Sequence, residues 1–212
     1  MEGKIIFLKN QLATLGGDTM SKIEREKMIE IEKRVREITK ELDFEKSLSV
    51  DIVSLVKKDG FQVKTKMMPI ETTGVLLVND NAERNKRIII VNKQFTNPDN
   101  EDDVIFKKSR FITAHEYGHF LLHKSADKSL YAHRDSDKRE EALELEADYF
   151  ARSLLMPLPY FKTCVDILSE MAIDDKEFSV AMLSKLFKVT RKKVRSRMED
   201  LHTLQPMDKV VQ

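Results

Sequence analysis

The sequence predicts an α+β protein with a small antiparallel sheet. Long stretches with apolar residues three to four positions apart surround a central region of short β-branched runs, and these two periods are typical of amphipathic helices and of strands. The 212 residues suffice for a sizeable hydrophobic core. A charged fraction of 34% with a net charge of +1 indicates a globular protein without whole-chain attraction to nucleic acid or membranes.

The first residues carry no sustained period, so we expect residues 1–19 to form a poorly ordered tail. The apolar run at 5–8 is too short for a signal-peptide core, and no run approaches the ~20 residues of a membrane span. One cysteine excludes an intramolecular disulfide and fits a reducing compartment. The protein is therefore expected in the cytoplasm, with no membrane partner.

Residues 20–44 are predicted to hold an amphipathic helix at about 21–42. Its apolar positions are Ile23, Met28, Ile31, Val35, Ile38 and Leu42. A second helix is expected from Ser49, as N-cap, to Lys58, with Gly60 as the left-handed residue beyond its end.

Three short runs predict strands, at 61–66, 73–78 and 87–91. The last two are joined by a polar loop, which favours neighbours in an antiparallel meander. Such a small sheet must bury one face on helices. Its edge also offers a place where an extended peptide could add as a strand.

The central motif is His115-Glu116-Tyr117-Gly118-His119, on a helix predicted from about 102 to 122. In a helix the two histidines lie one turn apart on one face, where both can bind a single zinc ion while Glu116 holds and deprotonates a water molecule. Two histidines are an incomplete ligand set. The motif therefore requires a third ligand from elsewhere and leaves a fourth position open.

Four residues compete as the third ligand: His123, His133, Glu141 and Glu144. His123 lies about 12 Å along a straight helix from His115, too far for one ion. We favour Glu144 because it lies on a second helix, predicted from Asp137 to about Met156, with Asp148 four residues later on the same face. Asp148 can accept the N–H of a zinc-bound imidazole. Glu141 and Glu146 are interpreted as part of a solvated acidic face.

The motif helix and the segment Glu144-Leu145-Glu146-Ala147-Asp148-Tyr149-Phe150-Ala151-Arg152-Ser153-Leu154-Leu155-Met156-Pro157 resemble the ImmA/IrrE family of zinc-dependent peptidases. The resemblance covers about residues 45 to 201. It implies a zincin-like metallopeptidase domain, here at 45–160, followed by helices. It also implies a zinc endopeptidase that cleaves a helix-turn-helix repressor and so relieves repression of a mobile element or a stress response.

Residues 161–203 are predicted to be helical, followed by a tail at 204–212. Helices at 179–187 and 191–201, with Thr190 as an N-cap between them, have the spacing of a helix-turn-helix hairpin. Arg197 is expected on its basic surface. The candidate partner-binding residues on that surface are Lys188, Arg191, Lys192, Lys193 and Arg195. Such a surface suits an acidic protein partner or, less favoured, DNA.

Two functions therefore stay open. One is a zinc endopeptidase that uses Glu116 as base; the other is a DNA- or protein-binding transcriptional regulator with a non-catalytic zinc site. A purely structural site is normally closed by four protein ligands and needs no base, so Glu116 favours the peptidase. The donor that would polarise the substrate carbonyl stays unassigned among Tyr117, His133 and Tyr160.

Overall fold

The computed structural model describes residues 6–11, 23–79, 86–96, 103–123, 136–171 and 175–204, with only the backbone given for 6–11, 79 and 136–139. The described chain divides into two compact units. The first holds the N-terminal strand and residues 51–151. The second holds residues 23–50 and those from 152 onward. The N-terminal helix therefore groups with the C-terminal helices.

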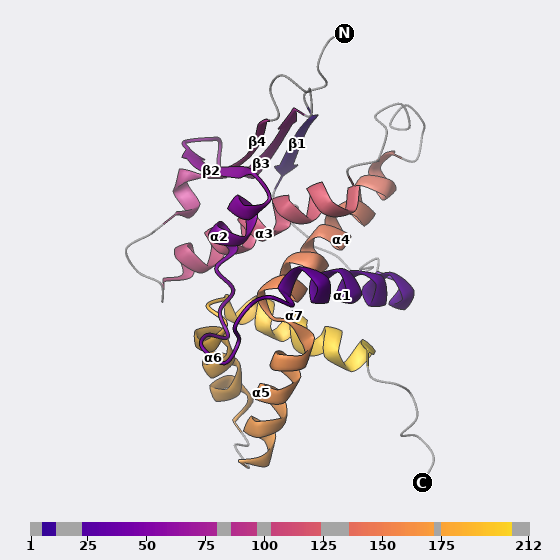
Figure 1. Cartoon of the computed structure of the whole chain (residues 1–212), viewed down its shortest axis with the longest axis vertical. Coiled ribbons are helices and arrows are strands. Elements are labelled where there is room, and N and C mark those ends of the chain that lie inside the picture. The colour runs from indigo at the N-terminus through magenta and orange to yellow at the C-terminus, as the bar shows by residue number, and fades with distance from the viewer. Residues whose placement is uncertain are drawn as a thin grey trace. The chain divides into compact units, whose positions relative to one another are not determined.

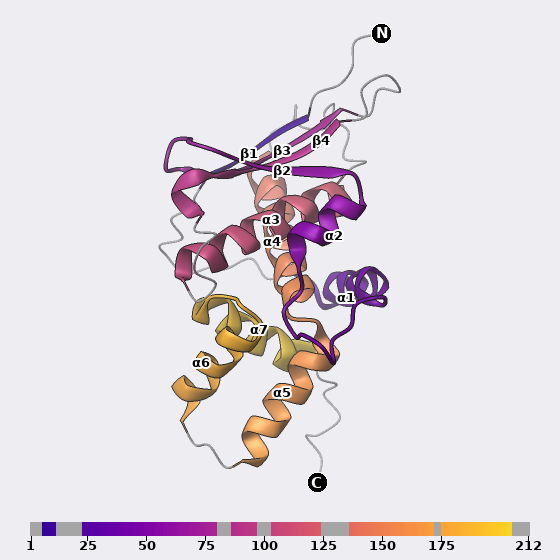
Figure 2. The same ribbon diagram turned by 60° about the vertical axis from the view of Figure 1, so that its left-hand side comes forward.

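A mixed sheet of four strands forms one layer of the first unit within the described residues, in the order β1-β3-β4-β2 (Figures 1 and 2). The strands are β1 (Ile6–Gln11), β2 (Phe61–Lys66), β3 (Thr72–Asn79) and β4 (Lys86–Asn92). β3 and β4 pair antiparallel, from Gly74 opposite Val91 to Asn79 opposite Lys86. The predicted antiparallel neighbours are thus confirmed.

The prediction of a wholly antiparallel sheet is wrong, because β2 pairs with β4 in parallel. The connection after β2 carries the chain past β4, so that β3 lies on its far side. Asn92 at the end of β4 holds this connection. Its fully buried amide donates to the carbonyl oxygens of Met68, Pro69 and Thr72 at 2.8–3.0 Å.

A strand also lies where the sequence predicted a poorly ordered tail. β1 pairs antiparallel with β3, from Ile6 opposite Val78 to Lys9 opposite Val75, and the register shifts before Gln11. A short apolar run shows no period of its own, and its strand is defined by hydrogen bonds to β3. The rest of the predicted tail lies outside the described residues.

The other layer of the first unit is helical. α3 (Val104–His123) runs across one face of the sheet, as Figure 2 shows, while α2 (Ile52–Lys58) packs beside β2. α2 begins later than predicted: its N-cap is Asp51, whose Oδ1 accepts from Ser54 N at 3.1 Å, and not Ser49. Gly60 has the predicted positive φ, +82°. The 3₁₀ turn η1 (Lys93–Phe95) follows β4.

The remaining long helix, α4 (Ser136–Leu155), packs against α3 at one glycine. A Cβ on Gly118 would stand 2.8 Å from Cδ1 of Phe150 and 3.4 Å from the carbonyl oxygen of Ala147. Only glycine allows the two helices to approach this closely. The close approach brings the acidic residues of α4 to the histidines of α3.

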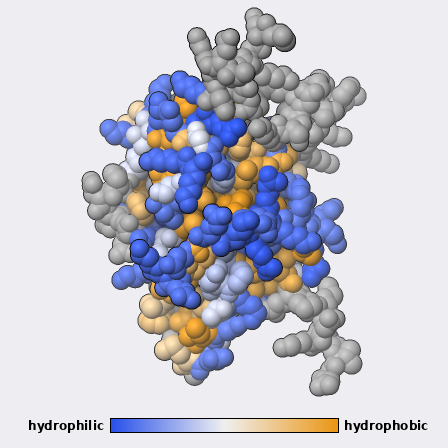
Figure 3. Space-filling model, viewed as in Figure 1, coloured by the Kyte–Doolittle hydropathy of each residue, from blue (hydrophilic) through white to orange (hydrophobic). Residues whose placement is uncertain are grey.

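The second unit is helical. It contains α1 (Arg25–Thr39), α5 (Leu158–Glu170), α6 (Lys176–Leu186) and α7 (Arg191–Leu204). α1 buries Met28, Ile31 and Val35, as its spacing predicted. Hydrophilic residues cover α1 in Figure 3. α5 lies mostly within the region 161–203 that the sequence predicted to be helical, but it begins earlier, at Leu158.

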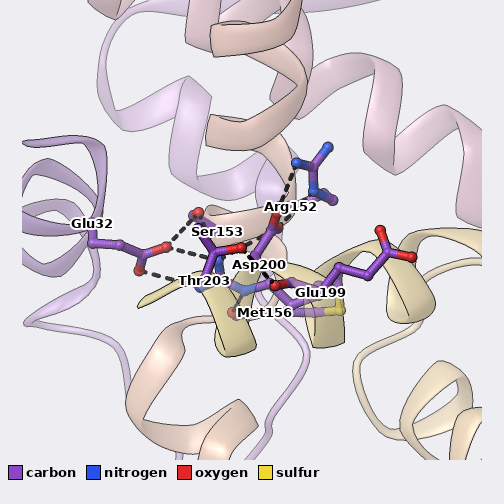
Figure 4. A network of polar contacts seen from close by, with 8 residues as sticks. Glu32, Arg152, Ser153, Met156, Glu199, Asp200 and Thr203 are labelled. Carbon is purple, nitrogen blue, oxygen red and sulfur yellow. Dashed lines mark hydrogen bonds and ion pairs between the residues drawn. The ribbon is translucent and has the colours of Figure 1, made fainter. Parts of the chain in front are cut away.

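A buried polar network joins α1 to the C-terminal helices (Figure 4). The guanidinium of Arg197 is fully buried and donates to Glu32 at 2.7 and 3.1 Å, to Ser153 Oγ at 3.0 Å and to the carbonyl of Met156 at 3.1 Å. Beside it, Arg152 and Asp200 form a bidentate pair. The prediction that Arg197 belongs to the basic surface is wrong, because its side chain is the donor of this network.

Candidate metal centre

The two histidines of the motif lie on one face of α3, as their spacing requires. His115 Nε2 and His119 Nε2 are 3.0 Å apart, and both side chains are buried. Because both imidazoles project from one rigid helix, no loop has to become ordered to bring them together. Their nitrogens therefore converge on one point at the surface of α3.

Glu144 of α4 reaches the same point. Its Oε2 lies 3.1 Å from His115 Nε2, and its Oε1 lies 3.2 Å from His119 Nε2. The three side chains offer donor atoms that all lie within 4.8 Å of one another. Four ligands placed tetrahedrally at about 2 Å from zinc are separated by roughly 3.3 Å. The two imidazoles and the carboxylate therefore fit a zinc-sized ion in donor type and in spacing.

Asp148 lies on the other side of the first imidazole. Its Oδ1 is 3.1 Å from His115 Nδ1, the nitrogen that faces away from the donor cluster. A carboxylate there accepts a hydrogen bond from Nδ1–H, so that Nε2 is the nitrogen left to bind a metal. The structure thus brings Asp148 into the position that its i+4 spacing from Glu144 predicted.

Glu116 has no exposed surface and lies against β3. A Cβ on Gly74 would stand 2.6 Å from Glu116 Oε1, so the missing side chain makes room for this carboxylate. Gly74 was not predicted from the sequence to belong to the site. A lone glycine inside a β-branched run is a signal of close backbone approach and could have found it.

The charges of the cluster are strongly coupled. Burial acts to lower the pKa of His115, but hydrogen bonds with Asp148 and Glu144 outweigh it and raise the pKa to about 10. Burial acts to raise the pKa of Glu144, yet hydrogen bonds with His115 and His119 bring it down to about 2. Burial lowers the pKa of His119. Without metal and near neutral pH, His115 is therefore a positively charged imidazolium beside an ionised Glu144.

The other candidates from the sequence lie elsewhere. His133 lies outside the described residues. Glu141 is exposed and is not part of the donor cluster. Tyr117 is buried, and its hydroxyl donates to Asp59. Tyr160 belongs to the second unit, where its ring stacks on Phe44.

His123 and Glu146 form a contact that the sequence did not predict. His123 Nδ1 lies 3.1 Å from His119 Nδ1, and His123 Nε2 lies 3.2 Å from Glu146 Oε2. His123 is not part of the donor cluster, as expected from its place along α3, but its ring contacts His119, which is. The signal in the sequence was the i+4 spacing of His119 and His123.

The candidate partner-binding residues differ in exposure. Arg191 and Lys192 are exposed, whereas Lys188 and Lys193 are half-buried. Arg195 is exposed and pairs with Glu177 at 2.6 and 2.8 Å. The turn between α6 and α7 is closed by Ser184, whose hydroxyl donates to the carbonyl of Val189 at 2.6 Å.

A His–His–carboxylate cluster with a buried glutamate beside it, on an α+β domain, is the arrangement of a metallopeptidase. The chain belongs to the IrrE N-terminal-like domain family, peptidase family M78, whose model matches residues 55–199. The resemblance seen in the sequence is thereby confirmed. No curated protein matches the chain. Among the described helices, none is both long and apolar enough to span a membrane.

Proposed function

We propose that this protein is a zinc-dependent, site-specific endopeptidase that hydrolyses a peptide bond in a regulatory protein. The observation that carries the proposal is the convergence of His115 Nε2, His119 Nε2 and a Glu144 oxygen within 4.8 Å. In this assignment all three residues hold the metal. A metal held by these three side chains could also bind water or the substrate carbonyl.

A zinc ion held by these residues would supply Lewis acidity and make water nucleophilic near neutral pH. Glu116 acts as the general base: a carboxylate oxygen accepts the proton of the attacking water and returns it to the leaving amine. Its burial against Gly74 fixes the carboxylate in place. Asp148 accepts a hydrogen bond from Nδ1–H of His115, which keeps that ring oriented toward the ligand cluster.

The substrate we favour is a cytoplasmic helix-turn-helix repressor, so that cleavage relieves repression of a mobile element or a stress response. Membership of the peptidase family supports a protein substrate, and the resemblance described above implies a repressor. An extended segment of the repressor would pair with a sheet edge and gain main-chain hydrogen bonds. Exposed basic side chains at Arg191 and Lys192, together with Lys188, Lys193 and Arg195, would contact an acidic patch of the same partner.

The second candidate function is a DNA- or protein-binding regulator whose metal site is not catalytic. The basic residues at the start of α7 favour it, since they follow a tight turn between two helices. DNA binding through these residues is the less favoured reading, because one of them, Arg195, is already paired with Glu177.

The decisive experiment incubates the purified protein, with and without chelator, with the repressor encoded beside its gene. We expect one cut, which is lost with chelator. It should also be lost in Glu116→Gln, because an amide cannot take the proton, while that variant keeps its zinc because Glu116 is not one of the three ligands. Glu144→Ala should lose the metal, whereas Glu141→Gln serves as the matched control. Cleavage by Glu116→Gln would contradict the mechanism. Full zinc retention in Glu144→Ala would contradict the ligand assignment.

A further inference from the structure

His119 is held from both sides of its ring. Nε2 faces the donor cluster, 3.0 Å from His115 Nε2 and 3.2 Å from Glu144 Oε1. Nδ1 faces His123 Nδ1 at 3.1 Å. The ring of His123 then continues to α4, where its Nε2 lies 3.2 Å from Glu146 Oε2. A continuous path of side chains therefore runs from the donor cluster to a carboxylate on the neighbouring helix.

The protons along this path have only one consistent arrangement when His119 binds a metal through Nε2. The remaining proton of His119 is then on Nδ1, which must donate to His123 Nδ1. His123 accepts with Nδ1, so its own proton is on Nε2. That proton is donated to Glu146, because an ionised carboxylate only accepts. Every group in the path then donates or accepts in the sense that the next group requires.

The path is also shielded from water. The side chains of His119 and His123 are 2% and 6% exposed, and that of Glu146 is 21% exposed. A buried imidazole nitrogen left without its partner would lose a hydrogen bond that water cannot replace. The two contacts therefore restrict the rotation of the His119 ring more than exposed contacts would.

We propose that His123 and Glu146 are positioning residues for His119: together they fix the tautomer and the ring orientation in which it binds the metal. The inference rests on the proposed function, because it takes His119 as a ligand. The two histidine ligands are then supported differently. His115 contacts the carboxylate of Asp148 directly, whereas His119 reaches the carboxylate of Glu146 through a second imidazole.

The test measures the zinc dissociation constant by competition with a chromophoric chelator, which is independent of any turnover. His123→Phe keeps a ring of similar shape but has no acceptor, and should weaken zinc binding by about 10–100-fold. His123→Asn is smaller, but its amide oxygen can stand where Nδ1 stood, and should recover part of the affinity. If His123 acted only by packing, Phe would be the better replacement and the order of the two variants would reverse.

Glu146→Ala should weaken zinc binding in the same direction, and the His123→Phe/Glu146→Ala double variant should be no weaker than His123→Phe alone, since the two residues act on one ligand. Glu140→Gln, an exposed glutamate on the same helix, is the matched control and should bind zinc as the wild type does. The absorption spectrum of the cobalt-substituted protein should change in His123→Phe and remain unchanged in Glu140→Gln.

Wild-type affinity in both His123→Phe and Glu146→Ala would overturn the inference, and so would an equal loss in Glu140→Gln. Failure of the proposed function gives a different result. The wild type would then bind zinc and show the expected order of variants, yet cleave no repressor. Circular dichroism of each variant separates lost affinity from lost folding, and His123→Asn and Glu146→Ala still test the inference if His123→Phe does not fold.

Discussion

Gly74 of β3 lies directly against the carboxylate of Glu116, so close that a Cβ there would stand 2.6 Å from Oε1 and 2.6 Å from Cγ2 of Ile112. Gly74→Ala must therefore move α3 or turn the Glu116 carboxylate. We expect a loss of about 1–3 kcal/mol in the free energy of unfolding, as for other overpacked interiors. We also expect a larger loss of peptidase activity than of bound zinc, because Glu116 is displaced while the zinc ligands stay.

The matched control for this substitution is Val75→Ala. Val75 is the next residue of β3, so its side chain projects to the opposite face of the sheet. The Val75→Ala variant should therefore keep an activity near that of the wild type. Urea denaturation and zinc content, measured on both variants, check the prediction. Unchanged activity in a well-folded Gly74→Ala would show that Glu116 tolerates displacement.

Gly118 in the middle of the motif has a comparable role between helices. A Cβ there would stand 2.8 Å from Cδ1 of Phe150, so Gly118→Ala should push α4 away from α3 and weaken zinc binding by separating Glu144 from the histidines. A second substitution, Phe150→Leu, replaces the clashing ring with a smaller side chain and should recover part of the zinc affinity. A double variant that binds zinc no better than Gly118→Ala would mean that Phe150 is not the obstacle. Calorimetric zinc titration of the two variants makes the comparison.

These contacts show which parts of the site the sequence could predict. The i+4 spacing places His115 and His119 on one face without any knowledge of the fold, and the same rule relates Glu144 to Asp148. Glu146 is two residues from Glu144, and residues two apart do not share a helix face. For this reason Glu146 was expected to lie on a solvated acidic face. The structure instead places its carboxylate 3.2 Å from His123. Contacts between helices of this kind depend on packing that local spacing does not contain.

The sheet and the basic helix show the same limit. The alternation of Phe61–Lys66 predicts a strand but not its partner, and the parallel pairing with β4 depends on how the following connection is held by Asn92. In the C-terminal helix, Arg197 looks like its basic neighbours in the sequence. It is buried because Glu32, far away in the chain, supplies a counterion.

The stability of the metal-free protein should depend on pH through His115 and Glu144. The pKa of His115 is raised from 6.5 to about 10 by folding, so its contribution is fully present below pH 6.5 and is lost as the pH rises toward 10. The pKa of Glu144 is lowered from 4.5 to about 2, so its contribution is present above pH 4.5 and is lost as the pH falls toward 2. The pair should stabilise the metal-free protein most between pH 4.5 and 6.5.

The measurement is urea denaturation of chelator-treated protein from pH 4.5 to about 9, with His115→Ala as the comparison. The wild type should lose stability above pH 6.5 relative to the variant. A difference between the two proteins that does not change between pH 6 and 9 would contradict the raised pKa of His115.

Zinc binding should release a proton for the same reason. At pH 7 the metal-free cluster holds a proton on His115, whose pKa is raised to about 10, and that proton must leave before Nε2 can bind the ion. The apparent affinity for zinc should therefore rise about tenfold per pH unit near neutrality, as expected when one proton is displaced. Calorimetry in buffers of different ionisation enthalpy counts the protons directly. A count near zero would mean that His115 is already neutral.

The last prediction concerns α1, which lies outside the residues that the family model matches. Its Glu32 accepts two hydrogen bonds from the fully buried guanidinium of Arg197 and one from Ser153 Oγ, at 2.7–3.1 Å. Glu32→Ala leaves that guanidinium buried without its carboxylate. We expect the second unit to lose about 3–5 kcal/mol of stability, the usual cost of breaking one side of a buried ion pair.

Replacing both partners should cost less than replacing one, so Glu32→Leu/Arg197→Met should be more stable than Glu32→Ala, because no buried charge then remains unpaired. Glu30→Ala is the control on the same helix: Glu30 is exposed and pairs with Lys27 one turn away, a contact typically worth less than about 1 kcal/mol. Thermal and urea denaturation of the three variants decide the matter. If Glu32→Ala is no less stable than Glu30→Ala, the guanidinium finds another acceptor and Glu32 does not stabilise the second unit. If it is far less stable, α1 is an integral part of the helical unit, and a protein cut back to residues 55–199 will not fold as the full chain does.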